Sequence, residues 1–523
     1  MPDPKVPSSI RTAHSNPGEG ALASSNDVAP SPPVHHTVVV SDVHLGEAEA
    51  SEGAWRYYRQ RRFFPDDDMR ELVGWLLARL RADDALDFVL DGDVFELEGP
   101  RVKQGVPVFD EAPRTEEDAI DRTARIVADH DEFFLALARI VDLGHRVVFV
   151  AGNHDAQLTF GGVQSAVRGA VAARAAHADE ALARVHVEPW FFRTRDGLHV
   201  EHGHQYDAYC AFRDPLRPLD PSGRVVSPTV GTLAFRQVMS RLGYFNAYDE
   251  RSYMLSFGRY LMHWVRYYLF TRRSMALAWL RGAIGIVGEL LESRPSQPLL
   301  AVVRSQAHLL REAYAETLDL DAEALEAHAA LFAEPADEDP YRVVREFHLD
   351  HVVLGAVGLA GIVTAAFKPR LGLALAMGAL AAGVAQELLR PRRSTRDEQA
   401  RIERAAREVS RIYGAKAVVF GHTHSPHAEV ENGVLYANTG AWAPQGEGLE
   451  TTPEGRPVVW LRRSLEGDEP RLEGGLYRWQ DAALRPEVTL GAPEEGARLP
   501  AKEREREPQE DRPLLPGLLP VPA

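Results

Sequence analysis

Hydrophobic residues gather in short runs along much of this chain, and several of these runs end abruptly in polar side chains. Runs that predict strands lie within residues 37–40, 87–96, 145–155, 197–207, 415–443 and 456–463. Continuous β-branched and aliphatic runs of this length are typical of strands buried on both faces of a sheet. By contrast, residues 67–82 and 120–141 repeat apolar positions at helical spacing, which predicts amphipathic helices between the strands.

This alternation of strands and helices predicts an α/β fold built from layers. The pattern changes after residue 207 and returns at about residue 415. We therefore expect one α/β domain interrupted by an insertion of roughly two hundred residues. The expected segments are a disordered N-terminal stretch (1–35), the first part of the domain (36–207), a helical insertion (208–346), an apolar helical hairpin (347–393), the second part of the domain (394–485) and a disordered tail (486–523).

The net charge and the cysteine content exclude some classes of function and of metal site. The 523 residues carry a net charge of -17, which argues against broad nucleic-acid binding because phosphate backbones require a basic surface. Cys210 is the single cysteine, so internal disulfides and thiolate metal sites are excluded. The first 35 residues lack the continuous apolar core of a signal peptide, so we expect the catalytic part in the cytoplasm.

The most apolar part of the chain, residues 352–385, predicts two helical arms joined at "KPR". Each arm of roughly fifteen residues would rise about 24 Å, which is short of the hydrocarbon core of about 30 Å. A few more apolar residues or local bilayer thinning would close the gap, and the basic "RPRR" at 390–393 suits a cytoplasmic flank. We expect a transmembrane hairpin and hence a membrane-associated protein; the alternative is a buried hairpin in a cytoplasmic protein.

Potential metal ligands follow five of the apolar runs. They are Asp42 and His44, Asp93, Asn153 and His154, His202, and His422 and His424. In open α/β sheets ligands bind beyond the carboxyl ends of the strands, so these side chains are expected to meet. Asp, Asn and His suit a two-metal hydrolytic centre, and the two oxygens of one carboxylate, such as Asp93, can bridge two ions.

Five motifs carry these residues, in the order "SDVHLG", "GDVFE", "GNHD", "HGHQYD" and "GHTH". Together they resemble the calcineurin-like metallophosphoesterase superfamily, whose pattern is D-x-H, G-D-x-x-[DE], G-N-H-[DE], a His-containing fourth motif and G-H-x-H. The resemblance covers residues 37–207 and 415–463. It implies a calcineurin-like layered β-sandwich flanked by helices.

The resemblance also implies roles for individual residues. One metal would be held by Asp42, His44, Asp93 and His424, and the second by Asp93, Asn153, His202 and His422. His154 would protonate the leaving oxygen or stabilise transition-state charge, and Asp155 would orient its imidazole. His204 is the alternative to His202 as a ligand, and Glu96 is expected to brace the site. We expect two divalent ions, with Mn favoured and Fe or Zn as alternatives.

The expected function is hydrolysis of a phosphodiester or pyrophosphate bond at a two-metal site near the membrane surface. "GDVFE" and the "HGxxxD" form of the fourth motif resemble the UDP-2,3-diacylglucosamine pyrophosphohydrolase branch, which implies a lipid-linked substrate. His204 and the long insertion depart from that branch. The alternatives are a phosphodiesterase or phosphatase acting on soluble substrates, and a scaffold that keeps the fold without catalysis.

Overall fold

The computed structural model describes residues 33–50, 55–109, 111–112, 114–248, 262, 264–269, 274–292, 297–339, 343–344, 349–389, 395–444, 455–466 and 469–490. Most of the two termini that we expected to be disordered, 1–35 and 486–523, lies outside these residues. Within the described part the strands β1 and β14 reach beyond the expected domain boundaries, to His35 and to Leu490.

The described strands form two large sheets and one small hairpin, β3 (Arg101–Lys103) with β4 (Val106–Val108). The larger sheet has the order β14 (Ala483–Leu490), β13 (Glu469–Gln480), β12 (Arg456–Glu466), β1 (His35–Val40), β2 (Ala85–Asp91), β5 (Arg146–Val150) and β6 (Val185–Glu188). The second sheet has the order β10 (His427–Glu431), β11 (Val434–Asn438), β9 (Ala417–Phe420), β8 (Leu198–Glu201) and β7 (Phe191–Arg193).

Apolar residues pack between the two sheets and also on their outer faces. In β1, Val39 joins Val200 and Val419 of the second sheet in one buried cluster, whereas Val38 and Val40 join the cluster beneath the helices. Both faces of β1 are therefore buried, which explains why its sequence is apolar without alternation. The strands β1, β2, β5 and β6 are parallel, so their carboxyl ends lie at one edge.

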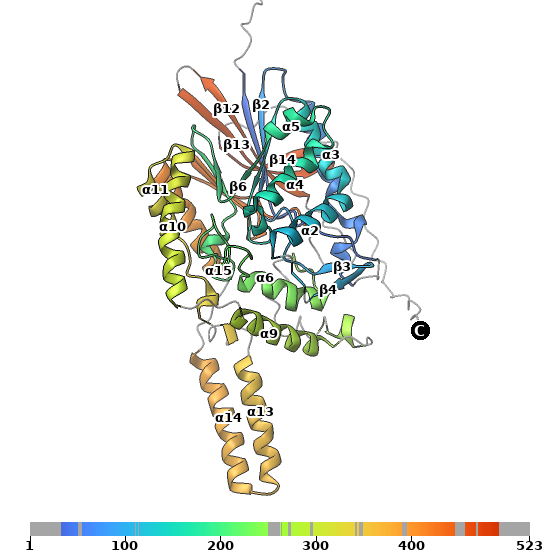
Figure 1. The fold of residues 1–523 in the computed structure, drawn as a ribbon, viewed down its shortest axis with the longest axis vertical. Helices are drawn as coiled ribbons and strands as arrows, with labels where there is room; N and C mark the ends of the chain where they lie inside the picture. Colours follow the sequence, from blue (N-terminus) through green and yellow to red (C-terminus); the bar gives the residue numbers. More distant parts are fainter. Residues whose placement is uncertain are drawn as a thin grey trace, which may run out of the picture.

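Helices cover the outer face of each large sheet (Figure 1). The larger sheet is covered by α1 (Asp66–Leu77), α2 (Glu116–Asp129), α3 (Asp131–Asp142), α4 (Gly161–Ala172) and α5 (Ala178–Arg184). The second sheet packs against α15 (Thr395–Tyr413). The expected layered α/β architecture is confirmed at this level, with mixed parallel and antiparallel strands.

One expected helix is divided. The periodic stretch 120–141 forms α2 and α3, because His130 between them has φ -123° and ψ 43°, outside the helical range. His130 is buried, and its ring nitrogens lie 2.8 Å from Asp66 Oδ2 and 3.1 Å from the Gly46 carbonyl oxygen. These contacts hold the break in place and tie it to the loop after β1.

The insertion lies between the neighbouring strands β8 and β9. Its described helices are α6 (Val230–Ala234), α9 (Met275–Glu292), α10 (Gln297–Leu318), α11 (Ala322–Ala329), α13 (Leu349–Ala365) and α14 (Pro369–Leu389). Short 3-10 or π turns in the described chain are η1 (Tyr57–Arg59), η2 (Arg61–Phe63), η3 (Ala156–Thr159), η4 (His204–Tyr206), η5 (Phe235–Met239), η6 (Ser240–Leu242), η7 (Trp264–Tyr268) and η8 (Ala336–Glu338).

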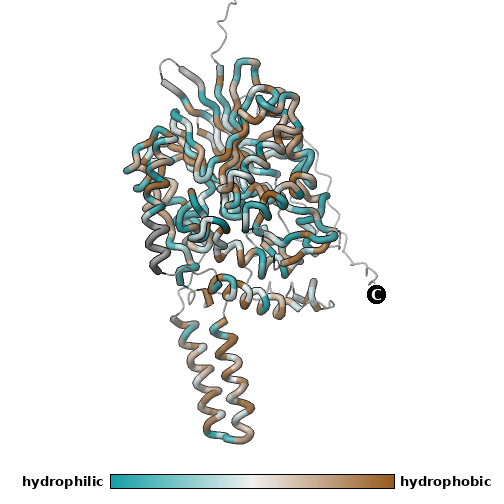
Figure 2. Tube along the Cα trace, viewed as in Figure 1, coloured by the Kyte–Doolittle hydropathy of each residue, from teal (hydrophilic) through white to brown (hydrophobic). Residues whose placement is uncertain are grey.

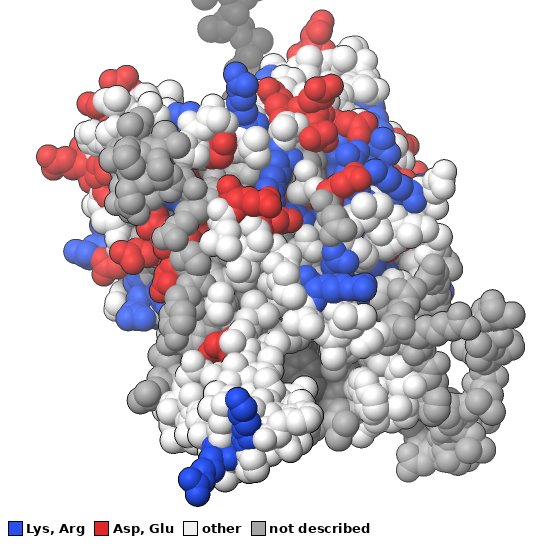
Figure 3. All heavy atoms as spheres, turned by 60° about the horizontal axis from the view of Figure 1, so that its bottom comes forward, with Lys and Arg blue, Asp and Glu red and all other residues white. Residues whose placement is uncertain are grey.

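Helices α13 and α14 form an apolar hairpin that projects away from the sheets (Figures 1 and 2). The two helices approach closely because Gly361 and Gly372 face each other, and a Cβ on Gly372 would lie 2.2 Å from the Ala365 nitrogen. The outward side chains are large and exposed: Leu359 is 63% exposed and Leu373 62%. In Figure 3 this part of the surface is nearly free of charge except for basic side chains at its far end.

The expectation that the hairpin spans a membrane is wrong. Among the described helices, none combines the length and the apolar character needed to cross a bilayer. Helix α13 has 17 residues, which rise only about 25 Å. Helix α14 is longer, but Arg370 near its start and Gln386 near its end shorten its apolar stretch. The expected membrane association is therefore not supported, and the described hairpin is exposed rather than buried.

Candidate metal centre

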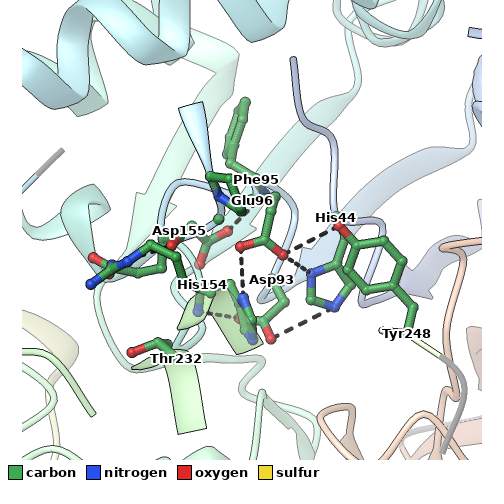
Figure 4. A network of polar contacts seen from close by, with 12 residues as sticks. His44, Asp93, Phe95, Glu96, His154, Asp155, Thr232 and Tyr248 are labelled. Carbon is green, nitrogen blue, oxygen red and sulfur yellow. Dashed lines mark hydrogen bonds and ion pairs between the residues drawn. The ribbon is translucent and has the colours of Figure 1, made fainter. Parts of the chain in front are cut away.

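The ends of five strands from both sheets meet at one edge and bring most of the expected ligands together. Asp42, His44 and His424 place one ligand atom each within 4.8 Å of the others, and Asp93, His202 and His422 do the same. These two groups follow the division of ligands between two metals that the sequence motifs implied. Figure 4 shows part of this region, with His44, Asp93 and His154 gathered around Glu96.

The backbone at the ligand positions is unusual. Positive φ angles occur at Asp42 (51°), His44 (51°), Asp93 (49°), His422 (69°) and His424 (56°). Residues other than glycine rarely adopt this region, which costs free energy and is concentrated at functional sites. Five of the seven expected metal ligands share it, because sharply turned loops follow the strand ends.

Glycines of the motifs admit ligands from neighbouring strands. A Cβ on Gly92 would lie 2.3 Å from the imidazole of His202, and one on Gly152 would lie 2.2 Å from Asp93 Oδ1. Real Cβ atoms do not come so close to other heavy atoms, so any larger residue would displace a ligand. Each glycine thus follows the end of one strand and makes room for a side chain that follows another strand.

Two carboxylate oxygens are surrounded by imidazole nitrogens. Asp42 Oδ1 lies 3.2 Å from His424 Nε2, 3.9 Å from His202 Nε2 and 4.0 Å from His44 Nε2. Asp93 Oδ2 lies 3.2 Å from His202 Nε2 and 3.9 Å from His44 Nε2. Asp93 therefore stands between the two groups of ligands, as a bridging carboxylate requires. Both aspartates are at most 1% exposed.

Fixed acceptors set the orientation of three of the imidazoles. The pairs are His44 Nδ1 with Glu96 Oε2 (3.1 Å), His202 Nδ1 with the Asp91 carbonyl oxygen (2.9 Å) and His424 Nδ1 with the Tyr248 carbonyl oxygen (2.7 Å). When Nδ1 carries the donated proton, the lone pair of Nε2 is free to bind a metal. All three Nε2 atoms face the aspartates.

His422 is held the other way round. Its Nε2 lies 3.3 Å from Asp207 Oδ2, which leaves Nδ1 as the atom available to a metal. The partner carboxylate comes from the fourth motif, 215 residues away along the chain. Sequence spacing alone therefore did not identify Asp207 as the residue that positions His422.

The residues fit a pair of divalent ions. Asn153 Oδ1 is buried and has no hydrogen-bond partner among the described residues, and the buried atoms Asp42 Oδ1 and His202 Nε2 contact only other candidate ligands. Buried polar atoms without partners are costly, and a cation that they ligate removes this cost. With Asp93 between the groups, the donor set contains imidazole, carboxylate and amide atoms, which suits Mn, Fe or Zn.

His154 is paired with a different carboxylate from the one expected. Its Nδ1 lies 2.8 Å from Glu96 Oε1, so Glu96 rather than Asp155 orients the imidazole. Burial alone would lower the pKa of His154, but the carboxylates of Glu96 and Asp93 raise it to about 9. Glu96 also contacts His44 and therefore braces two histidines at once.

The carboxylate of Asp155 binds backbone N–H groups instead of the imidazole of His154. Its carboxylate accepts hydrogen bonds from the N–H groups of Val94 (2.8 Å), Phe95 (3.2 Å) and Gly152 (2.6 Å). Burial and the nearby Asp93 raise the pKa of Asp155 to about 7. The expected role of Asp155 in orienting His154 is therefore corrected: it joins the loops after β2 and β5, because its oxygens are engaged by backbone donors while Glu96 takes the imidazole.

The fourth motif offers two histidines, and the geometry distinguishes them. His202 belongs to the group with Asp93 and His422, whereas His204 is in none of the groups of potential ligands found in the described chain. His204 is buried against Phe212, with ring centroids 5.6 Å apart. Burial, together with His202 and His422, places the pKa of His204 well below its usual value.

Sequence reasoning missed Tyr248, which comes from the insertion. Its ring stacks on His44, its carbonyl oxygen holds His424, and its hydroxyl accepts a hydrogen bond from Arg59 Nη1 at 2.8 Å. No motif surrounds Tyr248, and the aromatic residues nearby gave no signal that would single it out.

Comparison with known proteins identified no related protein or family. The sequence matches no protein-family model, and none of the curated proteins compared with it is significantly similar.

Proposed function

We propose that this protein is a calcineurin-like metallophosphoesterase that hydrolyses a phosphodiester or pyrophosphate bond with two divalent ions. The observation that carries the proposal is the position of Asp93 between two groups of ligands from different strand ends. The order of the five motifs supports the same function. When bound, two such ions would neutralise the phosphate and lower the pKa of an attacking water.

The chain's own residues supply binding and proton chemistry. Side chains of His154, His422 and His424 are 10–14% exposed, whereas those of Asp42 and Asp93 are at most 2% exposed. The substrate therefore approaches from the side of the three histidines. The raised pKa of His154 keeps its imidazole protonated near neutral pH, so it can donate a hydrogen bond or a proton to the leaving oxygen.

The test is hydrolysis by the purified full chain supplied with Mn²⁺. A generic soluble phosphodiester is compared with a nucleotide-linked diacyl sugar, because the motif resemblance suggests a lipid-linked pyrophosphate. Asp93→Asn removes the bridging charge and is expected to lower kcat by at least about 100-fold. Asp83→Asn, which changes an exposed carboxylate outside the motifs, is the matched control and is expected to retain activity.

The outcomes separate the alternatives. Faster hydrolysis of the lipid-linked substrate would assign the pyrophosphate branch, and activity only on the soluble ester would favour a soluble-substrate phosphodiesterase. Equal activity in the parent and in Asp93→Asn would contradict the proposed two-metal chemistry.

A further inference from the structure

A second group of buried ligand atoms lies outside the candidate metal centre. His199 and Glu201 belong to β8, and His328 belongs to α11 in the insertion. One ligand atom of each lies within 4.8 Å of the other two, and each residue is at most 2% exposed. Because successive strand residues point to opposite faces, Glu201 and the neighbouring His202 serve different sites.

The distances suit a small cation. Glu201 Oε2 lies 3.3 Å from His328 Nε2 and 3.7 Å from His199 Nε2. Ligand atoms about 2.0–2.2 Å from a tetrahedral zinc ion stand roughly 3.3–3.5 Å apart. His328 Nδ1 lies 3.1 Å from the Tyr413 hydroxyl, which turns Nε2 toward Glu201.

Hydrogen bonds reach Glu201 and His328 but leave His199 without a partner among the described residues. Glu201 accepts hydrogen bonds from the indole N–H of Trp190 at 3.1 Å and from the hydroxyl of Tyr206. His199 is fully buried, yet neither of its ring nitrogens has a hydrogen-bond partner among the described residues. A cation bound at Nε2 would give the ring a polar partner that the surrounding protein does not supply.

We propose that His199, Glu201 and His328 bind a structural divalent cation of the zinc class, separate from the two-metal centre. The Tyr206 hydroxyl is hydrogen-bonded to His328 Nε2 at 2.7 Å, and the bound ion would take the place of this contact. The ligands come from β8 and from a helix more than a hundred positions later, so the ion would fasten the insertion to the second sheet. The burial of all three ligands indicates a structural rather than a catalytic ion.

The experiment measures zinc bound to the full chain in the double variant Asp93→Asn/His424→Gln, which removes ligands from the two-metal centre. About one zinc ion per chain should remain after dialysis, as expected for a closed structural site, and adding His199→Phe should remove it. Phe keeps the ring but lacks nitrogen, and His199 has no hydrogen bond to lose among the described residues. Adding His308→Gln, which changes an exposed histidine on α10, should leave the zinc content unchanged.

A second measurement tests the proposal if the double variant Asp93→Asn/His424→Gln folds poorly. The otherwise unaltered chain should bind one more zinc ion than the single variant His199→Phe, with the fold of both checked by circular dichroism. Equal zinc content in the presence and absence of His199→Phe would overturn the proposal. This result would leave the two-metal proposal standing, since that proposal is tested by the activity of Asp93→Asn.

Discussion

The ring of Tyr248 lies nearly parallel to the imidazole of His44, with ring centroids 4.5 Å apart and planes inclined by 27°. Tyr248 belongs to the insertion, and His44 follows the first strand of the domain. The same tyrosine holds His424 through its backbone carbonyl. The insertion therefore takes part in shaping the candidate metal centre and is more than an appendage.

Replacing Tyr248 tests this relationship. Tyr248→Ala removes the stacked ring, and we expect metal affinity at the centre to fall about 10–100-fold, as for other groups that orient ligands. Tyr248→Phe keeps the ring and should weaken binding much less. Competition with a metal chelator measures both affinities, and equal affinity in Tyr248→Ala and the parent would contradict the role.

Gly92→Ala should displace the side chain of His202. The new Cβ would lie 2.3 Å from His202, and φ at this position is +72°, so the backbone strain adds about 1–3 kcal/mol of destabilisation. We expect loss of bound metal and a lower denaturation midpoint. Gly169→Ala within α4 has open space and should be neutral or stabilising by up to about 1 kcal/mol. Unchanged metal content in Gly92→Ala would refute the packing argument.

Glu96→Gln distinguishes the role of Glu96 from that of Asp155, the other carboxylate close to His154. Glutamine keeps the shape but loses the charge that pairs with His154 and His44, so kcat should fall about 10–100-fold while the fold persists. Glu117→Gln, an exposed change on α2, is the control.

Asp155→Asn should instead lower the thermal midpoint of the protein, because the carboxylate of Asp155 accepts hydrogen bonds from three backbone N–H groups.

Acid should destabilise the fold partly through His36. Burial lowers the pKa of His36 to about 4, although Asp84 opposes the shift. Between about pH 6.5 and 4 the unfolded chain therefore binds more protons than the folded one. The contribution of His36 to the free energy of unfolding is fully present above about pH 6.5 and is lost as the pH falls. From pH 7 to 5 the loss is about 1–2 kcal/mol. Urea unfolding of His36→Phe should show a correspondingly smaller difference between these pH values.

Removing the hairpin should reduce exposed apolar surface without unfolding the sheets. Helices α13 and α14 pack chiefly against each other, and their outer side chains are exposed. Replacing residues 349–389 by a short Gly/Ser linker should lower the fluorescence of an apolar dye and preserve the thermal midpoint. Undiminished dye binding would place the accessible apolar surface elsewhere.

The sequence predicted the strand ends and the ligands that follow them because parallel strands bring their carboxyl ends to one edge. It did not predict the pairing of His154 with Glu96, since Asp155 is next to His154 in the sequence whereas Glu96 lies 58 positions away and only the fold brings it to the imidazole. The break at His130 was also missed, because apolar spacing continues across it while the helical backbone does not. The prediction that the hairpin spans a membrane was wrong because the extra apolar residues that would lengthen its arms are absent: α13 has only 17 residues, and polar side chains bound the apolar part of α14.

The strands β8 and β9 are hydrogen-bonded neighbours, yet on the order of 200 residues separate them in the chain. At a synthesis rate of about 5–20 residues per second, the ribosome needs roughly 10–40 s to pass from one to the other. During that interval β8 has an open edge, and His422 and His424 do not yet exist. The nascent protein must therefore wait for the second part of the domain before His424 can join Asp42 and His44.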